Sequence, residues 1–88
     1  MIIKILVKGD VQGVFFKSNA KTVADNLGLK GTVKNLDNGD VQVFAQGEKE
    51  QLQQMIYFCN KGTMTSKIEK VEVEEINDAI VFEDFRVV

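Results

Sequence analysis

Two segments with helical spacing lie between segments with strand-like alternation, and this order constrains the fold of the chain most. Residues 16–27 carry apolar side chains three or four positions apart, as on the buried face of an amphipathic helix, and residues 52–59 repeat this spacing. Residues 3–7 and 41–45 instead follow a period of two, which is typical of strands. The chain is therefore predicted to run β-α-β-β-α-β, with one short strand added after it.

Glycine and asparagine residues mark the turns between these segments. Asn38-Gly39 lies between two strand-like runs, where this pair favours a β-hairpin, and Gly28 and Gly62 directly follow the helical segments. Two helices on one face of an antiparallel sheet make an α+β, ferredoxin-like βαββαβ sandwich. Because the chain has 88 residues, we expect a single domain spanning residues 1–88.

The last strands carry one irregularity. Within residues 66–76, Ile68 has the opposite parity to Val71 and Val73. A shift of one residue would turn the apolar face away from the core, so we expect a β-bulge near Glu69-Lys70. A short final strand then contributes Phe82, Phe85 and Val87.

The stretch Val7–Lys17 joins the first strand to the first helix through Gly9 and Gly13. The backbone N–H groups of such a loop, with the positive end of a helix dipole behind them, attract a small anion such as phosphate. Lys17 adds a positive charge near the first turn of the helix. The geometry alone favours a simple turn at the two glycines over a phosphate-binding loop, and it leaves both interpretations open.

Charge and residue content exclude several classes of function. A formal net charge of −2 is unlike that of a protein that binds nucleic acid without sequence preference, which needs an excess of Lys and Arg. The chain contains no histidine, and this excludes Ser-His and Cys-His nucleophilic pairs and any histidine metal site. We therefore expect no nucleic-acid partner and no metal.

The apolar residues indicate where the chain resides. No apolar run approaches the ~20 residues that a membrane helix needs, so we expect no membrane partner and a cytoplasmic location. Cys59 is the single cysteine, and it falls on the apolar stripe of the second helical segment. We expect a buried, unreactive thiol, which fits a reducing compartment.

Two segments resemble the signatures of the acylphosphatase family. Residues 7–17, V-K-G-D-V-Q-G-V-F-F-K, resemble its first signature, V-x-G-x-V-Q-G-V-x-F-R. Residues 31–41, continuing to Gly47, resemble the second, in which a basic residue and an asparagine precede a glycine–x–valine. The resemblance implies an enzyme that hydrolyses the carboxyl-phosphate bond of small-molecule acyl phosphates without a metal or organic cofactor, with inorganic phosphate as product or inhibitor.

The resemblance also implies roles for particular residues. Asn35 positions the attacking water, and Lys17 binds phosphate oxygens. Backbone amides of the loop wrap the phosphate, and the matching residues are Gly9, Asp10, Val11, Gln12, Gly13 and Val14. Phosphoryl transfer demands mainly positioning and charge stabilisation, and an asparagine can orient water through its carbonyl and N–H groups. Considered alone, Asn35 also fits the start of the turn before Asn38-Gly39.

Lys17 is the main departure from the family pattern, which has arginine at this position. Lysine keeps the charge but lacks the planar fork that binds two oxygens at once, so we predict reduced activity. Thr32 stands where the second signature has an aromatic residue, and we expect an effect on packing or on the outer wall of the site. Asp10 and Lys34 are expected to point away from the substrate, and Ser18 to cap the helix.

Other functions remain as alternatives. The main one is a non-catalytic ferredoxin-like module that binds an anion or a partner protein. A piece of a larger carbamoyl-transfer enzyme is disfavoured because the chain lacks zinc-ligand cysteines. RNA binding is disfavoured because Phe44 has no RNA-binding signature around it. The leading hypothesis is a monomeric acylphosphatase with a weakened hold on phosphate.

Overall fold

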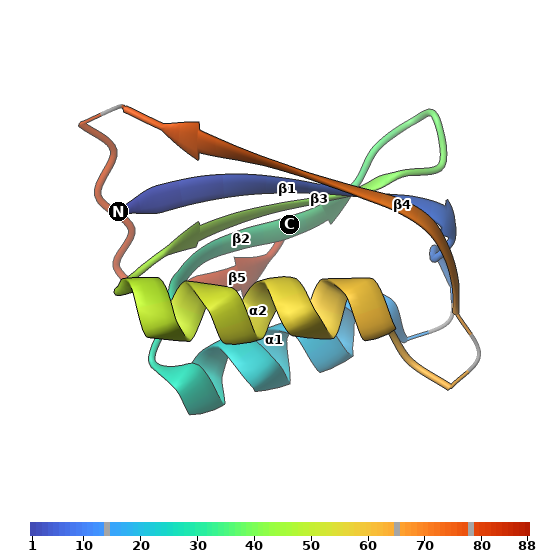
Figure 1. Cartoon of the computed structure of the whole chain (residues 1–88), viewed down its shortest axis with the longest axis horizontal. Helices are drawn as coiled ribbons and strands as arrows, with labels where there is room; N and C mark the ends of the chain where they lie inside the picture. The colour runs from blue at the N-terminus through green and yellow to red at the C-terminus, as the bar shows by residue number, and fades with distance from the viewer. Residues whose placement is uncertain (14, 65, 78) are drawn as a thin grey trace.

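The computed structural model describes residues 1–13, 15–64, 66–77 and 79–88, in which two helices pack on one face of a sheet (Figure 1). No helix in this part of the chain is long and apolar enough to cross a membrane. The predicted ferredoxin-like α+β sandwich is confirmed. Its elements are β1 (Ile2–Asp10), α1 (Phe16–Leu27), β2 (Lys30–Asn35), β3 (Val41–Gln46), α2 (Lys49–Lys61), β4 (Lys67–Ile76) and β5 (Phe85–Val87).

The described strands form one sheet in the order β4-β1-β3-β2-β5. The pairs β1–β3, β1–β4 and β2–β3 are antiparallel, as predicted. The short strand β5 is parallel to β2, so the sheet is mixed. β4 ends beside the start of β1, and the chain crosses this end of the sheet before β5 begins. Because β2 starts at the same end, β5 runs in its direction.

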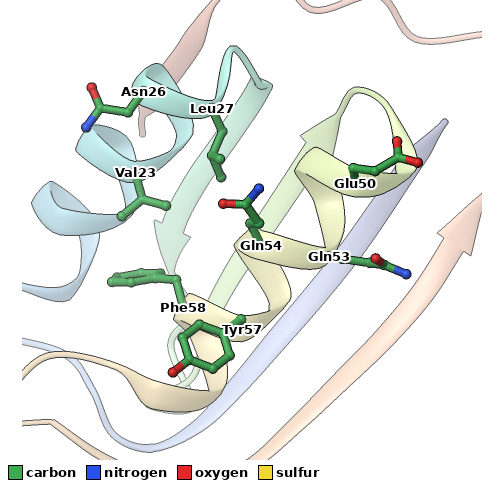
Figure 2. Close-up of a pocket in the computed structure, with 8 residues that line it drawn as sticks. All are labelled: Val23, Asn26, Leu27, Glu50, Gln53, Gln54, Tyr57 and Phe58. Carbon is green, nitrogen blue, oxygen red and sulfur yellow. The ribbon is translucent and has the colours of Figure 1, made fainter.

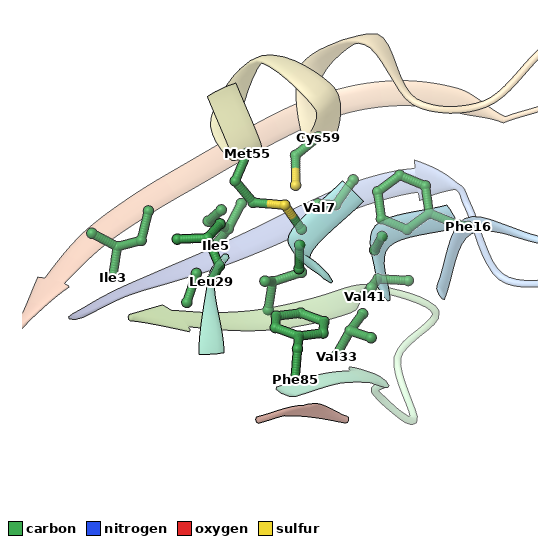
Figure 3. Close-up of a cluster of buried hydrophobic side chains, with 14 of the residues drawn as sticks. Ile3, Ile5, Val7, Phe16, Leu29, Val33, Val41, Met55, Cys59 and Phe85 are labelled. Atoms are coloured by element: carbon green, nitrogen blue, oxygen red, sulfur yellow. The ribbon is translucent and has the colours of Figure 1, made fainter. Parts of the chain in front are cut away.

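The core lies between the sheet and the two helices (Figure 3). Met55 and Cys59 of α2 point toward the sheet, and both are fully buried, as predicted for Cys59. Burial raises the pKa of the Cys59 thiol to about 12, which keeps it in the unreactive neutral form. The predicted apolar positions supply most of this cluster, which includes Ile3, Ile5, Val7, Phe16, Ala20, Ala24, Val41, Val43, Ala45, Leu52 and Phe85.

The predicted β-bulge lies where β4 passes the end of β1. Lys8 pairs with Lys70 and Gly9 with Ile68, so Glu69 is the extra residue. Gly9 has a φ of +136°, and a Cβ on it would collide with the main chain of β4. Glycine is required here because β4 approaches too closely for any side chain.

The predicted hairpin between β2 and β3 is also present. The Leu36 N–H donates to the Asp40 carbonyl at 2.8 Å, and the Gly39 N–H donates to the Leu36 carbonyl at 3.1 Å. Gly39 has a φ of +97°, as expected for the glycine of an Asn-Gly turn. Asn35 is therefore the last residue of β2 before the turn.

Comparing a buried methionine with an exposed one tests the position of the core. Met55→Ala should lower the free energy of unfolding by about 2–5 kcal/mol, because it leaves a cavity under α2. Met64 is fully exposed, and Met64→Ala should change this free energy by less than about 0.5 kcal/mol. Urea unfolding followed by circular dichroism measures both changes. Equal losses for the two variants would contradict this core.

Candidate active site

A hollow of about 340 Å³ lies where the β1–α1 loop, the first turn of α1 and the end of β2 meet. It contains Lys17 from the first turn of α1 and Asn35 from the last position of β2. The structure therefore brings together the two residues predicted to act on phosphate and water. The hollow is lined by Val11, Gly13, Phe15, Phe16, Lys17, Ser18, Asn35 and Val87.

The loop holds an unusual backbone conformation beside this hollow. Gly13 and Phe15 have φ values of +75° and +61°, and for phenylalanine this left-handed conformation costs on the order of 1 kcal/mol. The Phe15 side chain is 78% exposed, so packing does not hold it. Its carbonyl instead accepts hydrogen bonds from the Ser18 hydroxyl at 3.0 Å and from the Asn19 side chain at 2.8 Å. These bonds hold the strained turn in place.

The N-terminus of α1 has no side-chain cap and no acidic residue in its first turn among the described residues. The predicted capping role of Ser18 is wrong, because its hydroxyl donates to the Phe15 carbonyl and accepts no hydrogen bond from the first N–H groups. Those N–H groups and the positive end of the helix dipole are available to an anion in the hollow.

Lys17 and Asn35 are both available to a ligand. Neither side chain forms a hydrogen bond or an ion pair with any residue in the described ranges. Lys17 is the only lysine that lines the hollow within this part of the chain, and Lys34 is not among the lining residues. Lys34 and Asn35 are successive residues of β2, paired with Gln42 and Val41 of β3. Because successive side chains of a strand point to opposite faces of the sheet, Lys34 points away from the face of Asn35.

The residues predicted to wrap phosphate do not all line the hollow. Val11 and Gly13 line it, whereas Gly9 and Asp10 still belong to β1. The Asp10 side chain is exposed and does not line the hollow, in agreement with the expectation that it faces solvent. Val14 lies outside the described residues, and Gln12 turns its side chain toward the β2–β3 hairpin. Phosphate binding by these residues stays a prediction.

Gln12 joins the loop to the hairpin that carries Asn35. Its Nε2 donates to the Leu36 carbonyl at 2.8 Å and to the Asp40 carbonyl at 2.9 Å. The sequence pattern indicates a backbone role for Gln12 and contains no signal for this side-chain bridge, because its partners are main-chain atoms more than twenty residues away. Nor did the sequence indicate that Phe15 and Val87 border the hollow.

A buried carboxylate, Asp40, stabilises the same hairpin. Asp40 is only 9% exposed, and its Oδ2 accepts from the Lys8 ammonium at 3.0 Å and from the Asn38 side chain at 3.2 Å. The hydrogen bond and charge of Asp40, with a smaller contribution from Glu72 at 3.7 Å, raise the pKa of Lys8. Lys8 is therefore paired with carboxylates, and it is not among the described residues that line the hollow beside Lys17.

A larger hollow of about 540 Å³ lies between α1 and α2 (Figure 2). Figure 2 shows Val23 of α1 facing Phe58 of α2 and Leu27 of α1 facing Gln54 of α2 across it. Among the described residues, Glu50 is the only charged one that lines it, and because a carboxylate repels anions this groove is unsuited to phosphate. Nowhere in the described ranges do three His, Cys, Asp or Glu side chains gather to share a metal ion.

Thr32 lies away from the Lys17 hollow. It lines a third hollow beside β5, together with Phe82 and Arg86. The departure from an aromatic residue at this position therefore affects the packing next to β5 and does not alter the wall of the Lys17 hollow.

Comparisons with known proteins agree along nearly the whole chain. Residues 3–87 match the family model described as Acylphosphatase. An acylphosphatase of Marinobacter nauticus is 37% identical, with 93% of this chain and 89% of that protein covered. The crystal structure of acylphosphatase from Bacillus subtilis superposes with a TM-score of 0.94 at 34% identity, covering 100% and 99% of the two chains. The T. kodakarensis HypF structure, at 27% identity and a TM-score of 0.87, is matched over 100% of this chain but 12% of that chain.

Titration with inorganic phosphate distinguishes the two hollows. Phosphate should shift the amide NMR signals of Gly13, Phe15 to Ser18 and Asn35, because the uncapped helix start and Lys17 lie there. The signals of Tyr57 and Gln53 in the helix groove should not move. Shifts confined to the helix groove would contradict the assignment of the Lys17 hollow as the anion site.

Proposed function

The chain belongs to the acylphosphatase family and hydrolyses acyl phosphates, and we propose that the hollow shared by Lys17 and Asn35 is its active site. One observation carries this proposal: the Lys17 ammonium, the N-terminus of α1 and the Asn35 carboxamide border the same hollow, and none of the three has a side-chain partner among the described residues. An anionic substrate needs the first two groups, and an attacking water needs the third.

The phosphate of the substrate rests against backbone N–H groups of the loop and of the first turn of α1. The positive end of the α1 dipole stabilises its negative charge, and the Lys17 ammonium adds a full charge. No acidic side chain lines this hollow in the described ranges. The bound phosphate therefore meets no repelling carboxylate among these residues.

The Asn35 carboxamide orients the attacking water. Its carbonyl oxygen accepts a hydrogen bond from the water, whose oxygen forms a bond to phosphorus while the bond from phosphorus to the acyl oxygen breaks. The electron pair of that bond leaves with the carboxylate, and the water proton passes to a phosphate oxygen or to solvent. A carboxylate is a good leaving group, so no histidine is needed as an acid or base.

Lys17 limits the rate of this reaction. An ammonium group acts on the phosphate as a point charge, whereas the guanidinium of the family pattern holds two oxygens in one plane. Loss of one aligned transition-state donor lowers a rate by about a hundred- to a thousandfold. We therefore propose that the native chain binds phosphate but turns over slowly.

The domain organisation, oligomeric state and location of the enzyme are part of the same proposal. We propose that residues 1–88 form one domain that acts as a monomer in the cytoplasm. Support for the single domain comes from the match to residues 3–87 and from the shared core. Support for the monomer is that Lys17 and Asn35 come from one chain, and the buried free thiol of Cys59 fits a reducing compartment. Light scattering tests the monomer.

Changing Lys17 tests its role directly. Lys17→Arg should raise kcat/KM for a simple acyl phosphate such as acetyl phosphate by about a hundredfold, because it restores the planar fork. Lys17→Met should abolish turnover and weaken inhibition by phosphate. Lys34→Met is the matched control, because it removes an exposed lysine that does not line the hollow. Absence of turnover in both the native chain and Lys17→Arg would instead support the non-catalytic anion-binding module.

Changing Asn35 tests the placement of water. Asn35→Ala should lower kcat by about a hundredfold or more, while the inhibition constant of phosphate changes little, since the phosphate groups remain. Asn26→Ala, which changes an exposed asparagine in the helix groove, should leave both constants unchanged. Steady-state kinetics with phosphate as inhibitor measures them. An unchanged kcat in Asn35→Ala would refute the proposed role of Asn35.

A further inference from the structure

We infer that Gln12 is a positioning residue, whose side chain holds Asn35 in register with the phosphate-binding loop. This inference rests on the proposed function, since it concerns how the water-orienting group is kept in place. Lys17 and Asn35 stand on α1 and β2, and β2 is not a neighbour of β1, because β3 lies between them. Among the described strands, no ladder therefore joins the loop directly to the end of β2.

The Gln12 side chain makes this missing connection. Its Nε2 lies 2.8 Å from the Leu36 carbonyl and 2.9 Å from the Asp40 carbonyl. Both partners are acceptors only, so the nitrogen must face the hairpin and donate both of its hydrogens. Leu36 directly follows Asn35, so the contact is made one residue from the carboxamide that it positions.

The two carbonyls belong to the pair that closes the hairpin. The Asp40 carbonyl also accepts the Leu36 N–H at 2.8 Å, and the Leu36 carbonyl also accepts the Gly39 N–H at 3.1 Å. One carboxamide thus binds both sides of the hairpin loop, at the residues that directly follow β2 and directly precede β3. The Lys8–Asp40 ion pair reaches the same hairpin from β1, but Gln12 is part of the loop itself.

The Gln12 side chain acts on the reaction through Asn35. It is not among the described residues that line the hollow, and both of its hydrogens are directed to the hairpin, so we assign it a positioning role and not a contact with substrate. Displacement of a reacting group by about 1 Å can cost about a hundredfold in rate. A looser hairpin would move Asn35 and its water while Lys17 and the helix N-terminus stay in place.

A double-mutant cycle tests the coupling between Gln12 and Asn35. Gln12→Met keeps the length of the side chain but removes both donors, and it should lower kcat at least tenfold with less than a threefold change in the phosphate inhibition constant. In the Asn35→Ala background the same change should lower kcat by less than about threefold. The measurements are made in the native chain and in Lys17→Arg, well below the melting temperature.

Gln51→Met is the matched control. Gln51 is also a partly buried glutamine that joins two elements, donating to the Leu27 carbonyl at 2.7 Å and accepting the Glu48 N–H at 2.9 Å. Its loss should destabilise the fold but leave kcat unchanged. Amide hydrogen exchange provides a readout independent of activity: Gln12→Met should accelerate exchange at Leu36 and Gly39, and Gln51→Met should not.

The outcomes separate the two proposals. If Asn35→Ala lowers kcat but Gln12→Met keeps its full effect in that background, the coupling is refuted and the active site stands. If Asn35→Ala leaves kcat unchanged, both fail. Unchanged exchange at Leu36 in Gln12→Met also refutes the inference. If Gln12→Met does not fold, Gln12→Asn, whose carboxamide is one methylene shorter, is measured in the same way and should show the same coupling.

Discussion

The pairing of β1 with strands on both of its edges is the constraint on which the rest of the structure depends. Ile5 stands opposite Val43 of β3 and Val73 of β4, and its side chain is fully buried beneath the helices. A slip of one residue would turn the apolar face of β1 to solvent and would move Gly9 away from its close contact with β4. The end of β1, and with it the start of the β1–α1 loop, is therefore set by the core of the whole domain.

The sequence predicted the elements well because their signals are local. The apolar period identified both helices, the Asn38-Gly39 pair identified the hairpin, and the parity change placed the bulge at Glu69. The meeting of Lys17 and Asn35 in one hollow followed from the family signatures, which encode a long-range arrangement that periodicity alone does not contain. Considered alone, Asn35 fitted the start of a turn better than a catalytic role.

The features that the sequence did not predict depend on contacts between distant segments or on competition between acceptors. The parallel direction of β5 follows from where the chain crosses the sheet, and no residue pattern in β5 records that path. Serine is a residue type that often caps helices. The hydroxyl of Ser18 instead donates a hydrogen bond to the carbonyl of Phe15, which lies within reach because Phe15 has a left-handed backbone conformation. The hydrogen bond from Gln12 to Leu36 could not be predicted from the sequence, because its acceptor is a main-chain oxygen, which every residue carries.

The missing cap on α1 links the stability of the domain to the chemistry of its surroundings. A helix start without a side-chain acceptor is less stable than a capped one, and an anion bound there supplies the missing partner. Under the proposed function, inorganic phosphate, the product of the reaction, is expected to bind there and to stabilise the domain as well as inhibit the enzyme. By mass action, phosphate at a hundred times its dissociation constant adds about 2.7 kcal/mol to the free energy of unfolding. The melting temperature of this protein should consequently follow the phosphate content of its solution.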